Sequence, residues 1–465
     1  WKSMLTQRLP MDIITLLHVL RQGLDTTTLK RLGVLVQAML TMTGRITMLG
    51  LSRWAEKGGS YRTIQRFYNT TIPWGMTLWL FFKAHLYQSG TDYLLVGDES
   101  VVTKAGKTTH GLDRFFSCLF GKPVPGLAFL AFLAFSLVSI KERKSYPLLV
   151  EQVVRSDEEK ARIRREKAAQ VSRKDTRSKK KRKPGRPKGS TNKNKRQIHW
   201  NEELHQVKRM ASTLIERVHP LALRYLVLDG HFGTNNVMQM VRQSLSLHLI
   251  SKLRHDSALY FLYEGSQKPV GRKRVYGAKI DYESIPSKYL VQTDRHEDIQ
   301  ADIYQATMCH KSFADPLNVV IIVKTNLSTQ QKARVLLFSS DLNLAYDLLI
   351  ESYQLRFQIE FNFRDAKQFW GFEDFMNVEQ TPVTNAVGLS FFMVNFSHLL
   401  LTHFRQAVPE FGLLDLKADF RARRYARETL KLLPEGADPI LMDQILEAMP
   451  VLGSIRPQNA PLAAP

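Results

Sequence analysis

The sequence of 465 residues predicts an α/β protein, in which a mixed region of strands and helices lies between two helical ends. Residues 93–97 and 225–228 are short apolar runs rich in β-prone residues, as expected of buried strands. The segment around residue 360 instead carries apolar residues at helical spacing. Strands and helices that follow one another in this way are typical of an α/β core.

The first elements are predicted from the same patterns. Residues 1–88 carry Leu and Met at helix-like spacing, with a break at Gly58-Gly59. Residues 61–68 fit either a recognition helix that enters a DNA major groove or a plain packing helix with exposed arginines. Strand-like runs dominate residues 91–140, and residues 146–170 have a helical pattern.

The remaining elements follow in order along the chain. Helices are predicted over 201–218 and 235–244, and a strand over 247–253. A long stretch of β-like runs, such as 317–323, precedes the helix-patterned segment around residue 360. Helices are predicted from there to near Met449, and the Pro- and Ala-rich tail is expected to be disordered.

The chain is strongly basic. It has 66 Lys and Arg residues against 43 Asp and Glu residues, a formal net charge of +23 and a pI near 9.9. An excess of this size indicates a polyanionic partner such as nucleic acid. Residues 160–196 contain 18 basic and two acidic residues and so hold +16 of the net charge. We call this segment the basic arm and expect it to be mobile when no DNA is bound.

Within the basic arm, residues 183–190 resemble an AT-hook. Prolines keep the backbone extended and Gly185 removes bulk, which would let Arg186, flanked by Lys183 and Lys188, enter a narrow A·T-rich minor groove. The plainer alternative is a disordered charge run that binds any phosphate backbone and reads no sequence. A nuclear-localisation signal is a third interpretation of such a run.

Two aspartates end the two strand-like runs. Asp98 ends the first run and Asp229 ends the second. A carboxylate in such a place is costly unless it is paired or binds a metal. Each aspartate by itself could simply cap the turn that follows its strand.

The helix-patterned segment carries a polar stripe with one carboxylate among cations. Tyr353, Arg356, Glu360 and Lys367 fall within about 60° of arc on a helix, and Arg364 lies on the same side. The apolar positions gather on a different side, which predicts one amphipathic helix. A glutamate with arginines four residues before and after it is also found in ordinary surface ion pairing.

The spacing Tyr353-x2-Arg356-x3-Glu360-x6-Lys367 resembles the signature of bacterial DDE transposases of the insertion-sequence-4 superfamily. The resemblance implies an RNase H-like core with Asp98, Asp229 and Glu360 as its catalytic acids. It also implies that these three acids bind two Mg²⁺ ions, or Mn²⁺ in their place. The DNA-binding residues implied for this segment and the basic arm are Tyr353, Arg356, Arg364, Lys367, Lys183, Arg186 and Lys188.

The resemblance divides the chain into five regions. They are a helical DNA-binding domain at 1–88, the first part of the core at 89–253, a β-rich insertion at 254–334, the completion of the core with the Glu helix at 335–380, and a helical region with the tail at 381–465. In relatives the insertion helps to hold the transposon end and a flipped base. Core packing is the favoured role of the aromatic candidates for that contact, which are Tyr260, Phe261, Tyr263 and Tyr276.

The activity implied by the resemblance is cut-and-paste DNA transposition. The protein would bind transposon-end DNA, cleave it and join the 3′ ends to target DNA by two-metal-ion phosphoryl transfer. A homodimer on paired ends is expected, in the bacterial cytoplasm and associated with the nucleoid. The alternatives are a catalytically inactive DNA-binding regulator derived from a transposase, and an RNase H-like nuclease without strand transfer.

The cysteines, two apolar runs and His231 argue against several other kinds of site and against a membrane protein. Cys118 and Cys309 are the two cysteines, so neither a disulfide framework nor a cysteine-rich zinc site is indicated. The apolar runs 124–140 and 387–404 are predicted to be a buried hairpin and a core helix, and no membrane partner is expected. For His231, a local structural or DNA-contact role is favoured over metal ligation.

Overall fold

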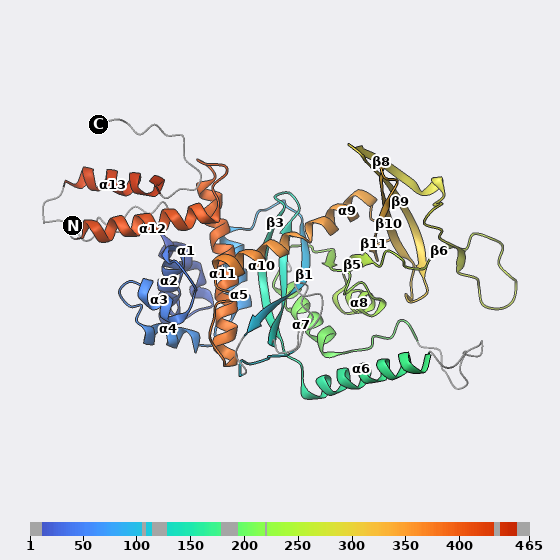
Figure 1. Ribbon diagram of the computed structural model, residues 1–465, viewed down its shortest axis with the longest axis horizontal. Helices are drawn as coiled ribbons and strands as arrows, with labels where there is room; N and C mark the ends of the chain where they lie inside the picture. Colours follow the sequence, from blue (N-terminus) through green and yellow to red (C-terminus); the bar gives the residue numbers. More distant parts are fainter. Residues whose placement is uncertain are drawn as a thin grey trace.

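The computed structural model describes residues 12–104, 108–113, 128–177, 194–218, 221–431 and 438–452. These residues form a mixed α/β structure with one large mixed sheet and many helices. The N-terminal and C-terminal helices lie together at one end of the molecule, and the strands of residues 259–339 lie at the other end (Figure 1).

The strands belong to one sheet of 11 strands. Its order is β3-β2-β1-β4-β5-β11-β10-β9-β6-β7, and β8 pairs with β9 outside this path. β1 is parallel to β4, and β4 is parallel to β5, whereas the other neighbours are antiparallel. The strands are β1 Tyr93–Lys104, β2 Ala128–Ser139, β3 Lys144–Val153, β4 Tyr225–Leu228, β5 His248–Leu253, β6 Leu259–Leu262, β7 Tyr276–Lys279, β8 Leu290–His296, β9 Ile299–His310, β10 Leu317–Asn326 and β11 Lys332–Ser339.

The helices occupy both ends of the chain and the connections of the sheet. The α-helices are α1 Ile13–Leu17, α2 Thr26–Thr41, α3 Met48–Trp54, α4 Tyr61–Tyr68, α5 Trp74–His85, α6 Asp157–Arg177, α7 Glu202–Arg217, α8 Asn235–Met240, α9 Tyr346–Leu355, α10 Gln358–Phe369, α11 Gln380–Phe404, α12 Leu413–Leu430 and α13 Pro439–Leu452. Shorter helical turns are η2 His18–Gln22, η3 Val241–Leu245 and η4 Ser287–Tyr289.

Local signals in the sequence explain several boundaries. The side chain of Asn201 accepts a hydrogen bond from the backbone N–H of Leu204 at 2.8 Å, which caps the first turn of α7. Trp200 stacks on His205, with ring centroids 4.7 Å apart, and this contact fixes the entry of the chain into α7. The Thr234 hydroxyl caps α8 in the same way, through the N–H of Val237.

The helix predicted over 146–170 is only partly correct. Residues 144–153 form β3, and α6 begins at Asp157. β3 pairs with β2, and Tyr146 to Val150 are buried without a break. A continuous apolar run has no period that separates a buried strand from a helix, so the pattern did not distinguish the two. Pro147 is accommodated at a β-bulge, where the register with β2 shifts between Phe135 and Ser136.

The single helix predicted around residue 360 is two helices. α9 ends at Leu355, α10 begins at Gln358, and Arg356 and Phe357 form the junction. Backbone N–H groups at this junction bond three residues back, from Phe357 to Gln354 and from Glu360 to Phe357. Such i to i−3 bonds tighten the turn and interrupt the α-helical hydrogen-bond pattern, although Arg356 and Phe357 keep right-handed helical backbone angles. The polar stripe of the sequence is therefore divided between two elements.

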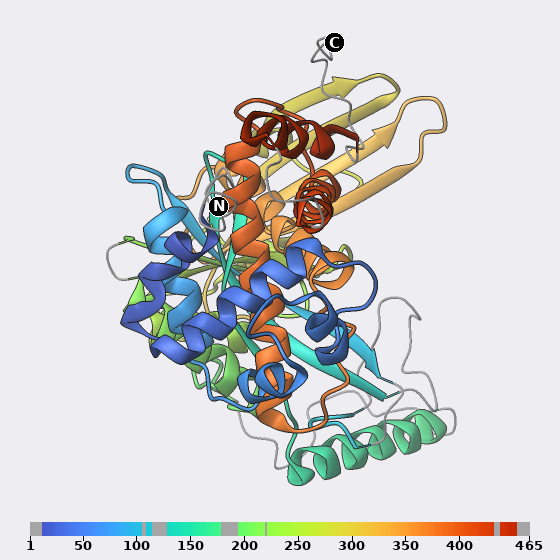
Figure 2. The same cartoon turned by 90° about the vertical axis from the view of Figure 1, so that its left-hand side faces the viewer.

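α11 is the central helix of the region where the two ends of the chain meet. In both views the orange α11 runs beside the blue N-terminal helices (Figure 1, Figure 2). Among the described residues it is the one helix long and apolar enough to span a membrane, but 72% of its most apolar window is buried inside the protein. The predicted core helix over 387–404 is thus confirmed. Of the predicted hairpin over 124–140, residues 128–139 form β2 and residues 124–127 lie outside the described part of the chain.

The side chain of Asn385 on α11 joins the N-terminal helices to this core. Its Oδ1 accepts a hydrogen bond from Trp74 Nε1 at 2.8 Å, and its Nδ2 donates to the carbonyl oxygens of Tyr68 and Thr70 at 2.7 and 2.6 Å. Asn385 is 1% exposed, so these bonds satisfy a polar group that water cannot reach. They fix α4 and α5 against α11.

Replacing Gly388 by Ala is expected to destabilise the protein by about 1–3 kcal/mol. A Cβ at this position of α11 would overlap the indole of Trp74, which is itself buried. Gly33→Ala in α2 is the matched control. Its Cβ would meet Leu17 Cδ1 at 3.7 Å, an ordinary contact, so a gain of about 0.5–1 kcal/mol is expected. Urea unfolding measures both variants, and a Gly388→Ala protein as stable as wild type would contradict this packing.

Candidate functional site

The register of β1 with β4 places Asp98 and Asp229 side by side. These strands are parallel and Gly97 pairs with Leu228, so Asp98 and Asp229 are the next residues after the last pair of this ladder. Asp229 follows the end of β4 as predicted. The prediction that Asp98 ends its strand is wrong, because β1 continues to Lys104 through its pairing with β2. A Cβ at Gly97 would lie 2.8 Å from Leu228 Cδ2 and 2.9 Å from a ring carbon of Phe135. Glycine at this position therefore allows the close approach of the strands that bring the two carboxylates together.

Backbone groups hold both aspartates in place. Asp98 Oδ1 accepts a hydrogen bond from the N–H of Glu99, and Asp229 Oδ1 accepts one from the N–H of His231, each at 2.9 Å. The hydroxyl of Ser251 on β5 donates to the carbonyl oxygen of Asp229 at 2.7 Å. Three neighbouring strands, β1, β4 and β5, thus contribute to the same end of the sheet.

Arg356 links the third predicted acid, Glu360, to Asp98. Its Nη1 lies 2.7 Å from Asp98 Oδ2, and its Nη2 lies 3.0 Å from Glu360 Oε1. The side chains of Arg356 and Asp98 are 12% and 16% exposed, whereas that of Glu360 is 41% exposed. The guanidinium carbon also lies 5.7 Å from the ring centre of Tyr353. Arg356 and Phe357 keep right-handed helical backbone angles, so Glu360 lies one turn beyond Arg356 and one guanidinium reaches both carboxylates.

The electrostatics show that the three acids share one environment. Burial raises the pKa of Asp98 to about 6, the Arg356 cation opposes this, and the Asp229 and Glu360 carboxylates raise the pKa further. Burial also raises the pKa of Tyr353, with further contributions from Asp229 and Asp98. A mutual influence of this kind requires the charged groups to be near one another. The structure therefore brings Asp98, Asp229, Glu360, Tyr353 and Arg356 together.

A second group of titratable residues, not foreseen from the sequence, lies next to these acids. His231 Nε2 lies 3.0 Å from Glu203 Oε1, and this hydrogen bond raises the pKa of His231 to about 9. Burial raises the pKa of Glu99 to about 7, Glu203 adds to this, and His231 opposes it. Glu99 follows Asp98 directly and Glu203 lies in the first turn of α7, but no sequence spacing indicates that these groups meet.

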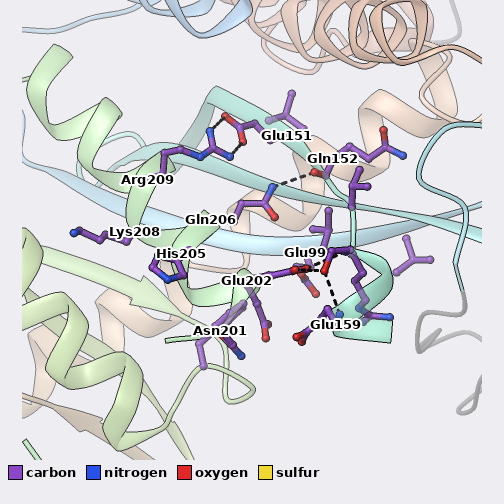
Figure 3. Close-up of a pocket in the computed structure, with 18 of the residues that line it drawn as sticks. Glu99, Glu151, Gln152, Glu159, Asn201, Glu202, His205, Gln206, Lys208 and Arg209 are labelled. Carbon is purple, nitrogen blue, oxygen red and sulfur yellow. Dashed lines mark hydrogen bonds and ion pairs between the residues drawn. The ribbon is translucent and has the colours of Figure 1, made fainter. Parts of the chain in front are cut away.

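Asp98 and Asp229, together with Glu99 and Glu203, lie in one wall of a large cavity. Its volume is about 1780 Å³, and Asp98, Asp229 and His231 are among its lining residues. Figure 3 shows further side chains of this cavity, among them Arg209, which forms two hydrogen bonds with the Glu151 carboxylate, one of them 2.9 Å long. The first residues of α6 form another part of the wall, where Ser156 bonds Glu202.

Two predicted DNA-binding residues of α10 have partners outside this group of acids. Lys367 Nζ donates to the carbonyl oxygen of Val101 at 3.0 Å and lies 3.1 Å from Glu373 Oε1. Arg364 pairs with Asp365 at 2.8 Å, and both line a separate cavity of about 420 Å³. Arg364 lies one turn beyond Glu360 on α10 and its side chain is 51% exposed, so its predicted DNA contact stays a prediction. Lys183, Arg186 and Lys188 lie outside the described residues.

The aromatic candidates of the insertion have packing partners. The rings of Phe261 and Tyr289 stack with centroids 4.7 Å apart, and those of Tyr260 and Tyr276 meet edge to face at 5.5 Å. Arg274 lies over the ring of Tyr263 at 4.6 Å. These contacts agree with the favoured packing role. On α4, Ile64 and Phe67 are buried and its arginines are exposed, which fits either interpretation of that helix.

The carboxylates of the site meet the needs of a metal ion only in part. Within the described ranges, no three His, Cys, Asp or Glu side chains are close enough to hold one ion as they stand. Asp98 and Asp229 nevertheless offer adjacent carboxylate oxygens, the ligands that Mg²⁺ prefers. The Arg356 guanidinium between Asp98 and Glu360 also marks a place where positive charge is favoured. Its Nε is buried without a hydrogen-bond partner, so this contact is incomplete. The residues fit a hard cation if Arg356 withdraws.

Acidic groups at the point where the parallel pairing of β1 with β4 stops, beside a large cavity, define a carboxylate-centred site on a mixed α/β fold. The family model described as DDE superfamily endonuclease matches residues 19–314. Because this match covers more than half of the chain, the protein belongs to the DDE superfamily of endonucleases. The matched residues include Asp98 and Asp229, whereas Glu360 lies beyond them.

Other comparisons are more distant. Among solved structures, the chain is similar to a chain in the cryo-EM structure of the piggyBac transposase synaptic complex with hairpin DNA. The two share 10% sequence identity with a TM-score of 0.39, and the similarity covers 99% of this chain and 81% of that chain. Similarity at this level transfers no residue roles. No curated protein matches the chain.

Arg356→Gln is expected to change how stability depends on pH. The pKa of Asp98 in the folded protein, about 6, lies above its ordinary value of 3.8, so the folded protein binds this proton more tightly than the unfolded chain. Protonated Asp98 therefore stabilises the folded protein, and its full contribution to the free energy of unfolding is present below pH 3.8. This contribution is lost as the pH rises to about 6. Without the Arg356 cation the pKa of Asp98 rises, so the loss should continue above pH 6.

Urea unfolding between about pH 5 and pH 8 measures this effect. The slope of the free energy of unfolding against pH should be steeper for Arg356→Gln than for wild type above pH 6. The double variant Arg356→Gln with Asp98→Asn is the control, because it has no carboxylate to titrate at residue 98. Equal slopes for wild type and Arg356→Gln would contradict the assignment of Arg356 as the cation that controls Asp98.

Proposed function

We propose that the protein is a DDE transposase that binds transposon-end DNA, cleaves it and joins the 3′ ends to target DNA. The observation that carries the proposal is the parallel pairing of β1 with β4, which sets Asp98 beside Asp229, with Glu360 connected to Asp98 through Arg356. Membership of a DDE endonuclease family supports a reaction at DNA phosphodiesters. The spacing around Glu360 supports the more specific insertion-sequence-4 assignment.

The proposed catalytic core is RNase H-like. In its support, three antiparallel strands, β3, β2 and β1, continue into two parallel strands, β4 and β5. The core would comprise residues 89–253 and 335–380, with residues 254–334 as an insertion. The insertion strands continue the same sheet through the pairing of β11 with β5. Residues 1–88 would bind the transposon end, and residues 381–465 would support them.

The proposed chemistry is phosphoryl transfer with Asp98, Asp229 and Glu360 as metal ligands. Two bound divalent ions would activate the attacking oxygen and neutralise the leaving oxygen. The chain's own contribution is to position the three carboxylates and to keep them ionised. Arg356, once released from them, would face a DNA phosphate, for which its planar fork is suited. Tyr353 lies beside Arg356 and would contact the same strand.

One observation favours a second candidate, a catalytically inactive DNA-binding regulator. Arg356 already pairs with Asp98 and Glu360, so its guanidinium occupies the position between these acids without any metal. A protein that kept this pair closed would bind DNA and never cut it. The two candidates differ in one measurable property, which is cleavage of DNA in the presence of Mg²⁺.

Replacing any one of the three acids by Ala should abolish metal-dependent cleavage. The assay incubates the purified protein with duplexes that carry the inverted repeats flanking its gene and Mg²⁺, and scores cleaved and joined products. Asp98→Ala, Asp229→Ala and Glu360→Ala should each lower the rate by at least about 1,000-fold, since positioning and metal binding fail together. Chelation of the metal should have the same effect on wild type, whereas DNA binding should change little in every case.

Glu351→Ala is the matched control for these variants. Glu351 lies on α9, two residues from Tyr353, but pairs with Arg143 on the surface at 3.2 Å. Its loss should leave cleavage unchanged. Cleavage that persists in Asp98→Ala would overturn the assignment of the site. Wild type that binds the duplex but never cuts it under any divalent metal would favour the inactive regulator.

Neutralising the proposed AT-hook should weaken DNA binding and flatten its salt dependence. In the triple Gln variant of Lys183, Arg186 and Lys188, up to three phosphate contacts are lost, so the slope of log K against log salt should decrease by up to about 2.7. A preference for A·T-rich duplexes that disappears in Arg186→Gln alone would support groove reading. An unaltered slope would remove this part of the basic arm from the DNA interface.

A further inference from the structure

The loop between β6 and β7 is a second basic segment, distinct from the basic arm and not assigned above. It spans residues 263–275, and residues 264–275 are all exposed. The loop extends from β6 at the end of the molecule opposite to α13 (Figure 1). Residues 264–275 contain four cations and one acid, Glu264, which pairs with Lys288 at 3.5 Å.

The loop has an internal frame that gives its tip a defined shape. The side chain of Gln267 bonds the backbone of Arg274 in both directions, with its Nε2 donating to the carbonyl oxygen and its Oε1 accepting from the N–H, each at 2.8 Å. The Arg274 guanidinium lies over the Tyr263 ring and donates to the carbonyl oxygen of Tyr276 at 3.2 Å. These contacts close the base of a six-residue segment, residues 268–273, which we call the tip.

The tip presents an apolar side chain among unpaired cations. Val270 is 85% exposed, more than any other large apolar residue in the described part of the chain. Lys268, Arg272 and Lys273 surround it in sequence, and no ion pair to a carboxylate of the described residues engages them. Gly271 has a φ of +103°, which other residues rarely adopt, and so permits the sharp turn after Val270.

We propose that the tip is a DNA wedge: Pro269 and Val270 insert at a base step from the minor groove while Lys268, Arg272 and Lys273 hold the flanking phosphates. Apolar wedges beside cations are the combination by which proteins unstack and bend a duplex from that groove. Free cations placed around an exposed valine match a polyanion rather than an apolar protein surface. DNA as the partner rests on the proposed function, and the wedge deepens it by naming a contact that bends the DNA.

Binding and bending are measured together on duplexes with the flanking inverted repeats, in EDTA so that no cleavage occurs. Anisotropy gives affinity as a function of salt, and energy transfer between dyes at the two duplex ends gives the bend. In the triple Gln variant of Lys268, Arg272 and Lys273, the slope of log K against log salt should decrease by about 2.7. In Val270→Ser the bend should be lost and affinity should fall about tenfold, with the slope unchanged.

Matched controls separate the tip from general changes. The triple Gln variant of Lys288, Lys332 and Arg334 removes the same charge from the same insertion, but at cations that already pair with Glu264 or Glu283. Leu414→Ser removes an apolar side chain that is 53% exposed, at the start of α12. Compared with the tip variants, both controls should keep an affinity, a salt slope and a bend closer to those of wild type.

The outcomes distinguish failure of the wedge from failure of the proposed function. If wild type binds the duplex but the tip variants have the same slope and the same bend as wild type, the wedge is refuted and the transposase proposal stands. If Val270→Ser alone behaves as wild type, the tip holds phosphates without inserting, and the wedge is refuted. If wild type binds no duplex at all, the proposed function itself fails, together with the wedge that rests on it.

Discussion

The parallel pairing of β1 with β4 is the constraint on which the site depends. It fixes two carboxylates side by side, Asp98 within β1 and Asp229 just after β4, and both burial and the neighbouring carboxylate oppose ionisation of Asp98. Backbone N–H groups and one guanidinium offset part of this cost. A fold that maintains such an arrangement holds a binding site for positive charge, and the rest of the sheet serves to keep its geometry.

The parts of this site that could be predicted are those with local signals. Asp229 ends a run of apolar, β-prone residues and follows β4 as predicted, and α7 begins at a capping asparagine. Asp98 ends a similar run, but β1 continues past it because β2 pairs with the polar residues that follow. The interruption between α9 and α10 had no such signal, because neither glycine nor proline stands at Arg356 and Phe357. At this interruption the Arg356 side chain lies between Asp98 and Glu360, a contact that no local pattern encodes.

Other differences between the predicted and the observed structure also come from contacts between distant parts of the chain. The run that forms β3 is apolar on both faces, so only its pairing with β2 identifies it as a strand. The meeting of Glu99, Glu203 and His231 depends on how α7 packs beside β1 and β4, which no spacing along the chain encodes. Arg364 does have the helical position expected of a site residue, but its guanidinium pairs with the neighbouring Asp365. Periodicity predicts a face of a helix, whereas the partner of a long side chain depends on the nearest charge.

The distribution of charge also connects the basic arm with the acids. α6, the first part of the arm, begins at the wall of the cavity that contains Asp98 and Asp229, and Ser156 anchors it there through Glu202. Beyond its first residues α6 lies apart from the rest of the molecule in both views (Figure 1, Figure 2). An isolated basic helix gains little from packing, and phosphate neutralises its charge. DNA bound along α6 would therefore be led toward the cavity, and its negative charge would compete with Asp98 and Glu360 for Arg356. Release of that guanidinium would then accompany DNA binding, which leaves the carboxylates available to a cation only when a substrate is present.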